Sequence, residues 1–124
     1  MIYTSYFAKI GSLPEGMVPI SISLWSPRWY TGLRYDKLAP SADLLIKWKD
    51  HEYDNEFYIR DFKRNILGKL DVCDVVEELR NLAGFDNVKD IVLVCYEKPS
   101  DFCHRHIVTA WLKSYGIKCK ELSL

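Results

Sequence analysis

Two segments near the start of the chain have the hydrophobic pattern of β-strands. The stretch from Ile2 to Ala8 is rich in β-branched and aromatic residues and stops before Gly11 and Pro14. From Val18 to Trp25, apolar residues alternate strictly with serines, which is the pattern of a half-buried strand. The sequence therefore predicts two strands, the first of which begins almost at residue 1.

The middle of the chain has the spacing of three consecutive helices. Apolar residues recur there at intervals of three and four, which places them on one face of each helix. Ser41 and Asp71 are suited to cap the N-termini of the first and third helices. Gly68 and Gly84 lie at the positions where glycine commonly ends a helix, after the second and third helices. The predicted helices span Ala42 to Lys49, Glu56 to Leu67, and Asp71 to Gly84.

The last third of the chain adds a buried strand, a helix and a short strand. Ile91 to Tyr96 is an uninterrupted apolar run, typical of a central strand that is covered on both faces. Ser100 opens a helical pattern that Gly116 ends, and Ile117 to Leu122 follows as a final strand. Strands separated by helical crossovers predict an α/β fold, a three-layer sandwich around a small, mainly parallel, Rossmann-like sheet. We expect one domain over residues 1–124, because this length suits a single core.

The carboxyl ends of the strands are the usual ligand-binding edge of such a sheet. This rule brings together three segments that are far apart in the sequence: Ser5 to Ala8, Ser23 to Arg28, and Cys95 to Arg105. We therefore expect the main pocket at the carboxyl end of the 91–96 strand.

Composition narrows the classes of function. The 17 Lys and Arg residues balance 17 Asp and Glu residues, so the chain lacks the basic excess typical of general nucleic-acid binders. No apolar run approaches the roughly 18–20 residues of a membrane span, and the first residues lack the pattern of a signal peptide. We expect a cytoplasmic protein without a membrane partner. Its four cysteines are then expected as reduced thiols, since none lies in a cysteine-rich framework.

The segment from Cys95 to His106 contains the densest cluster of candidate chemistry. Glu97 follows the buried strand and is a candidate general acid or base, which His104 would assist by orienting a group or shuttling a proton. Arg105 lies one turn into the last helix, where it could bind phosphate or carboxylate together with the helix N-terminus. The structural alternative for Arg105 is a salt bridge to Glu97 or Asp101.

Cys103 has two interpretations. Beside His104 and Arg105 at a helix N-terminus, its thiol would have a lowered pKa and could act as a nucleophile. Alternatively it packs in the core, because it shares a helical face with Ile107 and Trp111. The adjacent cysteine and histidines are metal-ligand types, but at helical spacing they do not share one face and no Cys-x-x-Cys pair is present. The sequence therefore predicts no metal site and identifies no cofactor.

The segment from Ser26 to Pro40 lacks periodicity and reads as an ordered loop. Its arginines alternate with aromatic residues, which could stack on a base or ribose and bind its phosphate. Alternatively, the aromatic side chains pack over the end of the sheet as a small satellite core. In the first interpretation Arg28 and Tyr35 bind the ligand, and the residues at the strand ends, Ser5, Tyr6 and Ser23, line the same pocket.

These residues together resemble a known family. The features that carry the resemblance are Cys95 and Glu97 followed by Cys103-His104-Arg105, an N-terminal Tyr3-Thr4-Ser5-Tyr6 strand, and a second strand that leads into Ser26-Pro27-Arg28. They are similar to the bacterial and phage family catalogued as domain of unknown function 488, and Leu38-Ala39-Pro40-Ser41 resembles its short-form members. The resemblance implies a compact α/β fold with these polar residues around one pocket. It implies no established reaction.

The leading hypothesis is a small enzyme or ligand-binding domain that acts on an anionic, nucleotide-like small molecule. The alternative is a non-catalytic module that sequesters or senses the same ligand. A weaker alternative is a nucleic-acid-binding protein, in which Arg28, Arg34, Lys98 and Arg105 would form one basic rim.

Overall fold

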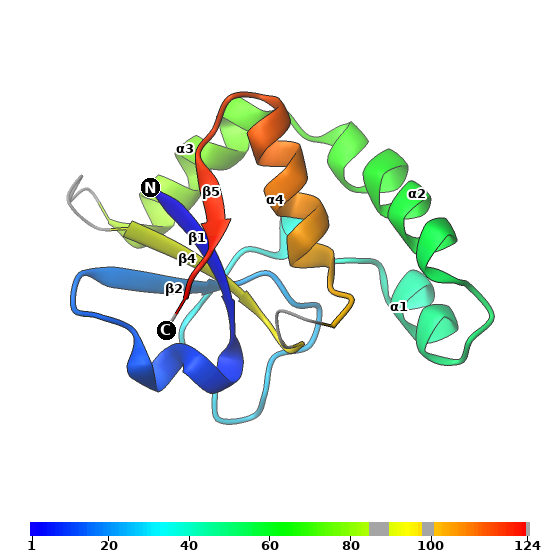
Figure 1. Cartoon of the computed structure of the whole chain (residues 1–124), viewed down its shortest axis with the longest axis horizontal. Helices are drawn as coiled ribbons and strands as arrows, with labels where there is room; N and C mark the ends of the chain where they lie inside the picture. The colour runs from blue at the N-terminus through cyan, green and yellow to red at the C-terminus, as the bar shows by residue number, and fades with distance from the viewer. Residues whose placement is uncertain (85–89, 98–100, 124) are drawn as a thin grey trace.

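The computed structural model describes residues 1–84, 90–97 and 101–123 and contains a five-stranded sheet in the order β3-β2-β4-β1-β5 (Figure 1). Each pair of neighbouring strands is parallel, which confirms the predicted class of sheet. The strands are β1 (Ile2–Tyr6), β2 (Met17–Ser21), β3 (Leu33–Arg34), β4 (Asp90–Cys95) and β5 (Cys119–Glu121).

Side-chain caps mark the starts of three of the helices. Ser41 accepts a hydrogen bond from the Leu44 N–H at 3.1 Å, and Asp54 and Asp71 cap the next two α-helices in the same way. Gly84 follows the third with a φ of 103°, a left-handed conformation that glycine adopts without a steric penalty. The α-helices are α1 (Ala42–Lys49), α2 (Asn55–Asn65), α3 (Val72–Ala83) and α4 (His104–Ser114), and the 3₁₀ segments are η1 (Phe7–Ser12), η2 (Asp36–Leu38) and η3 (Leu67–Lys69).

The two faces of the sheet are covered by different kinds of structure. All four α-helices of the described residues contribute buried apolar residues to the main core, which includes Ile20 and Leu93 of the sheet. On the opposite face, Phe7 packs with Val92 and Val94. The result is the predicted three-layer, Rossmann-like α/β fold, with η1 in place of a long helix on the second face. No helix in the described ranges is long and apolar enough to cross a membrane.

β4 is the central strand that its sequence predicts. It pairs with β1 on one side and β2 on the other, and its residues from Ile91 to Cys95 are all buried. Tyr6 is the partner of Cys95 in the β1–β4 register, so the carboxyl ends of these two strands lie side by side. The polar residues that follow β4 are thereby placed at the carboxyl edge of the sheet.

Several element boundaries differ from the predicted ones. The segment from Ser26 to Pro40 contains β3 and η2, and β3 is too short to display any alternation. The second strand ends at Ser21, and Gly68 lies inside η3 rather than at the end of α2. The final helix begins at His104, while its predicted first residue, Ser100, lies outside the described residues.

Candidate functional site

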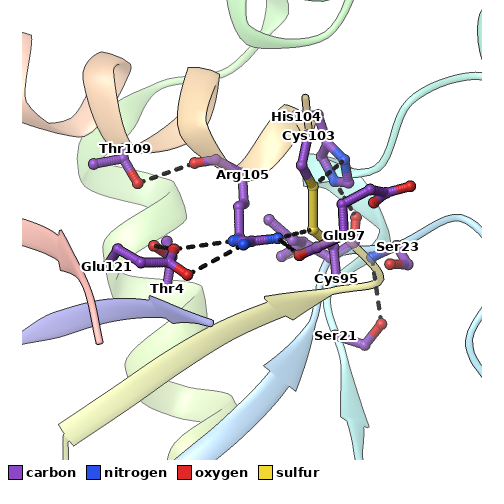
Figure 2. Close-up of a disulfide and its surroundings, with 11 residues drawn as sticks. Thr4, Ser21, Ser23, Cys95, Glu97, Cys103, His104, Arg105, Thr109 and Glu121 are labelled. Carbon is purple, nitrogen blue, oxygen red and sulfur yellow. Dashed lines mark hydrogen bonds and ion pairs between the residues drawn. A yellow bond between two sulfur atoms is a disulfide. The ribbon is translucent and has the colours of Figure 1, made fainter. Parts of the chain in front are cut away.

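A pocket with a volume of about 260 Å³ opens at the carboxyl ends of β2 and β4. Ser23 and Glu97 come from the segments that follow these strands, and His104 is the first residue of α4 (Figure 2). Lys49 comes from the end of α1. A pocket is thus present at the carboxyl end of β4, where the strand-end rule places the candidate site. Its remaining lining residues are Leu24, Trp25, Pro40, Leu45 and Tyr96.

Opposite charges and aromatic surface meet in this pocket. Lys49 provides an ammonium group and Glu97 a carboxylate, while Trp25 and Tyr96 are each about half exposed, at 50% and 49%. The N-cap of α4, Cys103, makes no side-chain capping bond, and no acidic residue lies in the first turn. The positive end of the α4 dipole thus lies at the pocket without an acidic side chain of its own helix.

His104 is a buried and neutral imidazole. Its Nε2 lies 2.7 Å from the carbonyl oxygen of Ile22, which can only accept, so Nε2 is the protonated nitrogen. Nδ1 then has the free lone pair, and it lies 3.9 Å from Sγ of Cys103. Burial disfavours the charged ring and lowers the pKa of His104 to about 4. Near neutral pH the ring therefore stays uncharged, and the lone pair of Nδ1 can bind a metal ion.

Arg105 is fully buried beside the pocket and is bonded inside the protein. Its guanidinium donates to both carboxylate oxygens of Glu121, at 3.0 Å from Nε and 3.1 Å from Nη2. Thr4 donates to the same carboxylate at 2.7 Å, and the backbone carbonyl of Glu97 accepts from Nη1 of Arg105 (Figure 2). The geometry therefore gives Arg105 a structural partner, Glu121, in place of the predicted anion, and the partner is neither the Glu97 nor the Asp101 carboxylate.

Cys95 and Cys103 form a disulfide, which corrects the expectation of four reduced thiols (Figure 2). Cys95 is the last residue of β4 and Cys103 directly precedes α4, so the disulfide links the end of this strand to the start of this helix. Cys103, predicted as a nucleophile, thus has no free thiol in this state and is itself buried. Cys73, which is exposed, and Cys119, which is buried, are free cysteines.

The sulfur atoms of Cys95 and Cys103 and a ring nitrogen of His104 lie within 4.8 Å of one another. The prediction of no metal site assumed that Cys103 is helical. Its backbone is instead extended, with φ −154° and ψ 143°, so Cys103 and His104 are not constrained to different helical faces. Cys95 reaches the same point from β4. The spacing argument against a metal ion therefore does not apply.

In addition to Arg105, four predicted ligand-binding residues do not line the pocket. Ser5 is buried, and its Oγ has no hydrogen-bond partner among the described residues. The ring centroid of Tyr6 lies 5.8 Å from the guanidinium carbon of Arg105. Tyr35 donates from its hydroxyl to Glu78 of α3 at 2.6 Å, and Arg28 is exposed outside the pocket.

Two aromatic residues of the 26–40 segment, Trp29 and Tyr30, pack around Phe7. The ring centroids of Trp29 and Tyr30 lie 6.1 and 5.2 Å from that of Phe7, which also contacts Tyr96 at 5.1 Å. These contacts match the satellite-core interpretation. They also bring the ends of β1 and β4 together with this segment, as the strand-end rule predicts.

The basic rim considered for nucleic acid is not assembled from the described residues. Arg105 is buried, and Arg34 pairs with Asp36 at 3.2 Å and donates to the Leu24 carbonyl at 2.9 Å. Lys98 lies outside the described residues. Only Arg28 of this set is exposed without an ion pair in the described part of the chain.

Sequence reasoning missed two residues at this edge. Lys49 ends a predicted helix, and nothing in its local pattern indicates what its side chain faces. Glu121 pairs in register with Thr4 because β5 lies beside β1. This strand order would have suggested a carboxylate near α4, but hydrophobic periodicity alone does not give strand order.

Comparison with known proteins gives a family assignment. Residues 12–116 match the family model described as the active DUF488-N3 subclade. No curated protein and no solved structure matches the chain. The matched range includes β2 to β4 and all of α4, and therefore the residues that line the pocket. On this evidence the chain belongs to the DUF488 family, domain of unknown function 488.

Proposed function

We propose that this protein binds an anionic, nucleotide-like small molecule in the pocket between β2, β4, α1 and α4, and that Glu97 acts on it as a general acid or base. The observation that supports the proposal most is the convergence of Glu97, Lys49 and His104 from three separate elements on one cavity. Pockets that combine an apolar wall with a few convergent polar groups are the usual sites of small-molecule binding.

The size and walls of the cavity favour a compact ligand with a flat ring. Its volume of about 260 Å³ is just below the range of roughly 300–1,000 Å³ typical of small-molecule sites, so it would enclose one ring system while the rest of a nucleotide extends from its mouth. Trp25 and Tyr96 offer exposed aromatic surface on which such a ring can stack. Lys49 and the N-terminus of α4 favour a negatively charged substituent.

Glu97 and His104 have different expected roles. The carboxylate of Glu97 can give or take a proton at the ligand, a contribution typically worth roughly 10²–10⁴-fold in rate. His104 is fixed by its bond to the Ile22 carbonyl, so it shapes the wall beside Glu97 and presents a neutral ring to the ligand. The description of the matched subclade as active is consistent with an enzyme.

The test is an assay of a panel of nucleoside monophosphates and diphosphates against the purified protein. Binding is measured by thermal shift and calorimetry, and conversion is measured by mass spectrometry. We expect wild type to bind and convert at least one class of compound. Glu97→Gln should retain affinity within a few-fold and lose roughly 100-fold in turnover, because the amide keeps the shape but does not transfer a proton.

Glu77→Gln provides a matched control, since Glu77 is exposed on α3 and outside the pocket. This variant should behave as wild type. Binding without conversion by the wild-type protein would show a non-catalytic ligand-binding module. Absence of both binding and conversion across the panel would overturn the proposed ligand class.

A further inference from the structure

We propose that Cys95, Cys103 and His104 form a three-ligand site for Zn²⁺ when the bond between the two cysteines is reduced. The three candidate ligand atoms already lie within 4.8 Å of one another. Zinc bonds to thiolate sulfur at roughly 2.3 Å and to imidazole nitrogen at roughly 2.0–2.1 Å, so a small inward shift would bring all three into contact with one ion. This inference does not depend on the proposed function of the pocket.

Cys95 and Cys103 both lie at the ends of secondary-structure elements, which fix their backbone positions. Cys95 ends the central strand β4, which is paired on both sides, and Cys103 is the extended residue that caps α4. The Cα atoms are 7.6 Å apart, which is wider than the roughly 4.4–6.8 Å usual for a disulfide. That separation leaves space for an ion between two thiolates.

The surroundings of these ligands match those of a metal site. The protonated Nε2 of His104 donates to the Ile22 carbonyl, which fixes the ring with the lone pair of Nδ1 toward Cys103. A histidine that binds a metal ordinarily has its other nitrogen bonded in this way. Nη1 of Arg105 lies 3.0 Å from Sγ of Cys95, and a cationic donor stabilises a thiolate.

The charges and the chemistry balance. Two thiolates neutralise the divalent ion, and Glu121 neutralises Arg105. A phosphine reductant supplies the two electrons that break the sulfur–sulfur bond, and one water molecule supplies two protons to the sulfur atoms and its oxygen to the phosphorus, which gives two thiols and the phosphine oxide. Zinc then displaces one proton from each thiol. The three residues are buried, which suits a small ion better than exchange with another protein's thiol.

Three protein ligands leave the fourth position of a tetrahedral ion open. Zinc sites with three protein ligands usually bind water or a substrate there. His104 lines the pocket, so the ion would lie next to the pocket wall. The predicted site is therefore of the open type and not of the fully ligated structural type.

The first experiment uses the wild-type protein and needs no substitution. Protein reduced with a phosphine, and freed of metal, is alkylated with iodoacetamide in the presence or absence of Zn²⁺, and each cysteine is quantified by peptide mass spectrometry. We expect zinc to slow alkylation of Cys95 and Cys103 at least 10-fold and to leave the exposed Cys73 unaffected. Equal rates at Cys95 and Cys103 with and without zinc would overturn the proposal.

The second experiment replaces zinc with Co²⁺, whose absorption reports thiolate ligation and tetrahedral geometry. Reduced wild type and the control Cys73→Ser should develop the same thiolate-to-cobalt band at one ion per chain. Cys103→Ser should lose most of this band, with folding of the variant checked by circular dichroism. The same band in Cys103→Ser, or no band in reduced wild type, would contradict the site. If Cys103→Ser does not fold, the alkylation experiment decides.

Discussion

Two groups of polar side chains lie side by side at the carboxyl edge of the sheet, and they differ in how they are bonded. Arg105 and Glu121 form a closed cluster in which the guanidinium is fully buried and bonded to the carboxylate through two nitrogen atoms. Lys49 and Glu97 instead line an open pocket, and neither side chain forms an ion pair within the described residues. The comparison suggests that the closed cluster stabilises the fold and that the open pocket binds a ligand.

The largest expected effect is on the closed cluster. Arg105→Met should lower the free energy of unfolding by about 3–4 kcal/mol, the lower part of the range for a broken buried pair, because it removes the buried guanidinium while the partly exposed Glu121 carboxylate regains some hydration. Urea denaturation at pH 7 measures this change. Arg28→Met is the matched control, and its exposed side chain should contribute less than about 0.5 kcal/mol. A loss below 1 kcal/mol for Arg105→Met would mean that the cluster is not structural.

The next effect concerns pH and His104. The pKa of His104 is lowered to about 4 in the folded protein, from 6.5 in the unfolded chain. Between these values the unfolded chain takes up a proton that the folded protein does not, so stability falls as pH decreases through this window and levels off below it. The expected contribution is about 3 kcal/mol, since each pKa unit corresponds to roughly 1.4 kcal/mol.

His104→Gln should remove this part of the pH dependence while keeping a donor for the Ile22 carbonyl. Urea denaturation at several values between pH 4 and 7 provides the comparison. His51→Asn is the control, because His51 is exposed and asparagine tolerates its left-handed backbone. An unchanged slope in His104→Gln would contradict the assignment of a buried, neutral ring.

A smaller effect is expected for the open pocket. Lys49→Ala should weaken binding of a nucleoside monophosphate about 10-fold, or about 1.4 kcal/mol, while stability changes by less than about 0.5 kcal/mol. Lys63→Ala is the matched control on the exposed side of α2 and should leave affinity unchanged. Equal affinities of the two variants, measured by calorimetry, would place the anion away from Lys49.

The smallest effect is expected at Tyr35, which lies outside both groups. Its hydroxyl donates to Glu78, and burial together with this carboxylate raises the pKa of Tyr35. Tyr35→Phe should cost about 1 kcal/mol of stability through the lost hydrogen bond and leave ligand affinity unchanged. Thermal denaturation measures the change in stability, and calorimetry measures the ligand affinity. Weakened binding at unchanged stability would restore Tyr35 as a ligand-binding residue.

Much of the fold could be predicted because local pattern determines it. The uninterrupted apolar run from Ile91 identifies β4, and capping residues such as Ser41 and Asp71 place helix starts correctly. β3 could not be predicted, because two residues are too few to show a period. β3 is defined by its pairing with β2, whose residues lie 13 positions earlier in the sequence, and this pairing leaves no local pattern.

The candidate site was predicted only in part. Glu97, His104 and Ser23 could be placed at the pocket because the strand-end rule depends on topology alone. The rule does not indicate which charged side chains form ion pairs within the protein. The pairing of Arg105 with Glu121 requires the order of β1 and β5, and the Cys95–Cys103 contact requires the position of the start of α4 relative to the end of β4.

The most direct test of the distinction between the open pocket and the closed cluster is a two-dimensional NMR titration of ¹⁵N-labelled protein with nucleoside monophosphates. The four tryptophans give separate indole N–H signals, and Trp25 lines the pocket whereas Trp111 lies on α4 outside it. We expect the Trp25 signal to shift in a saturable way and the Trp111 signal to remain in place. Saturable shifts at Trp111 with none at Trp25 would contradict the account.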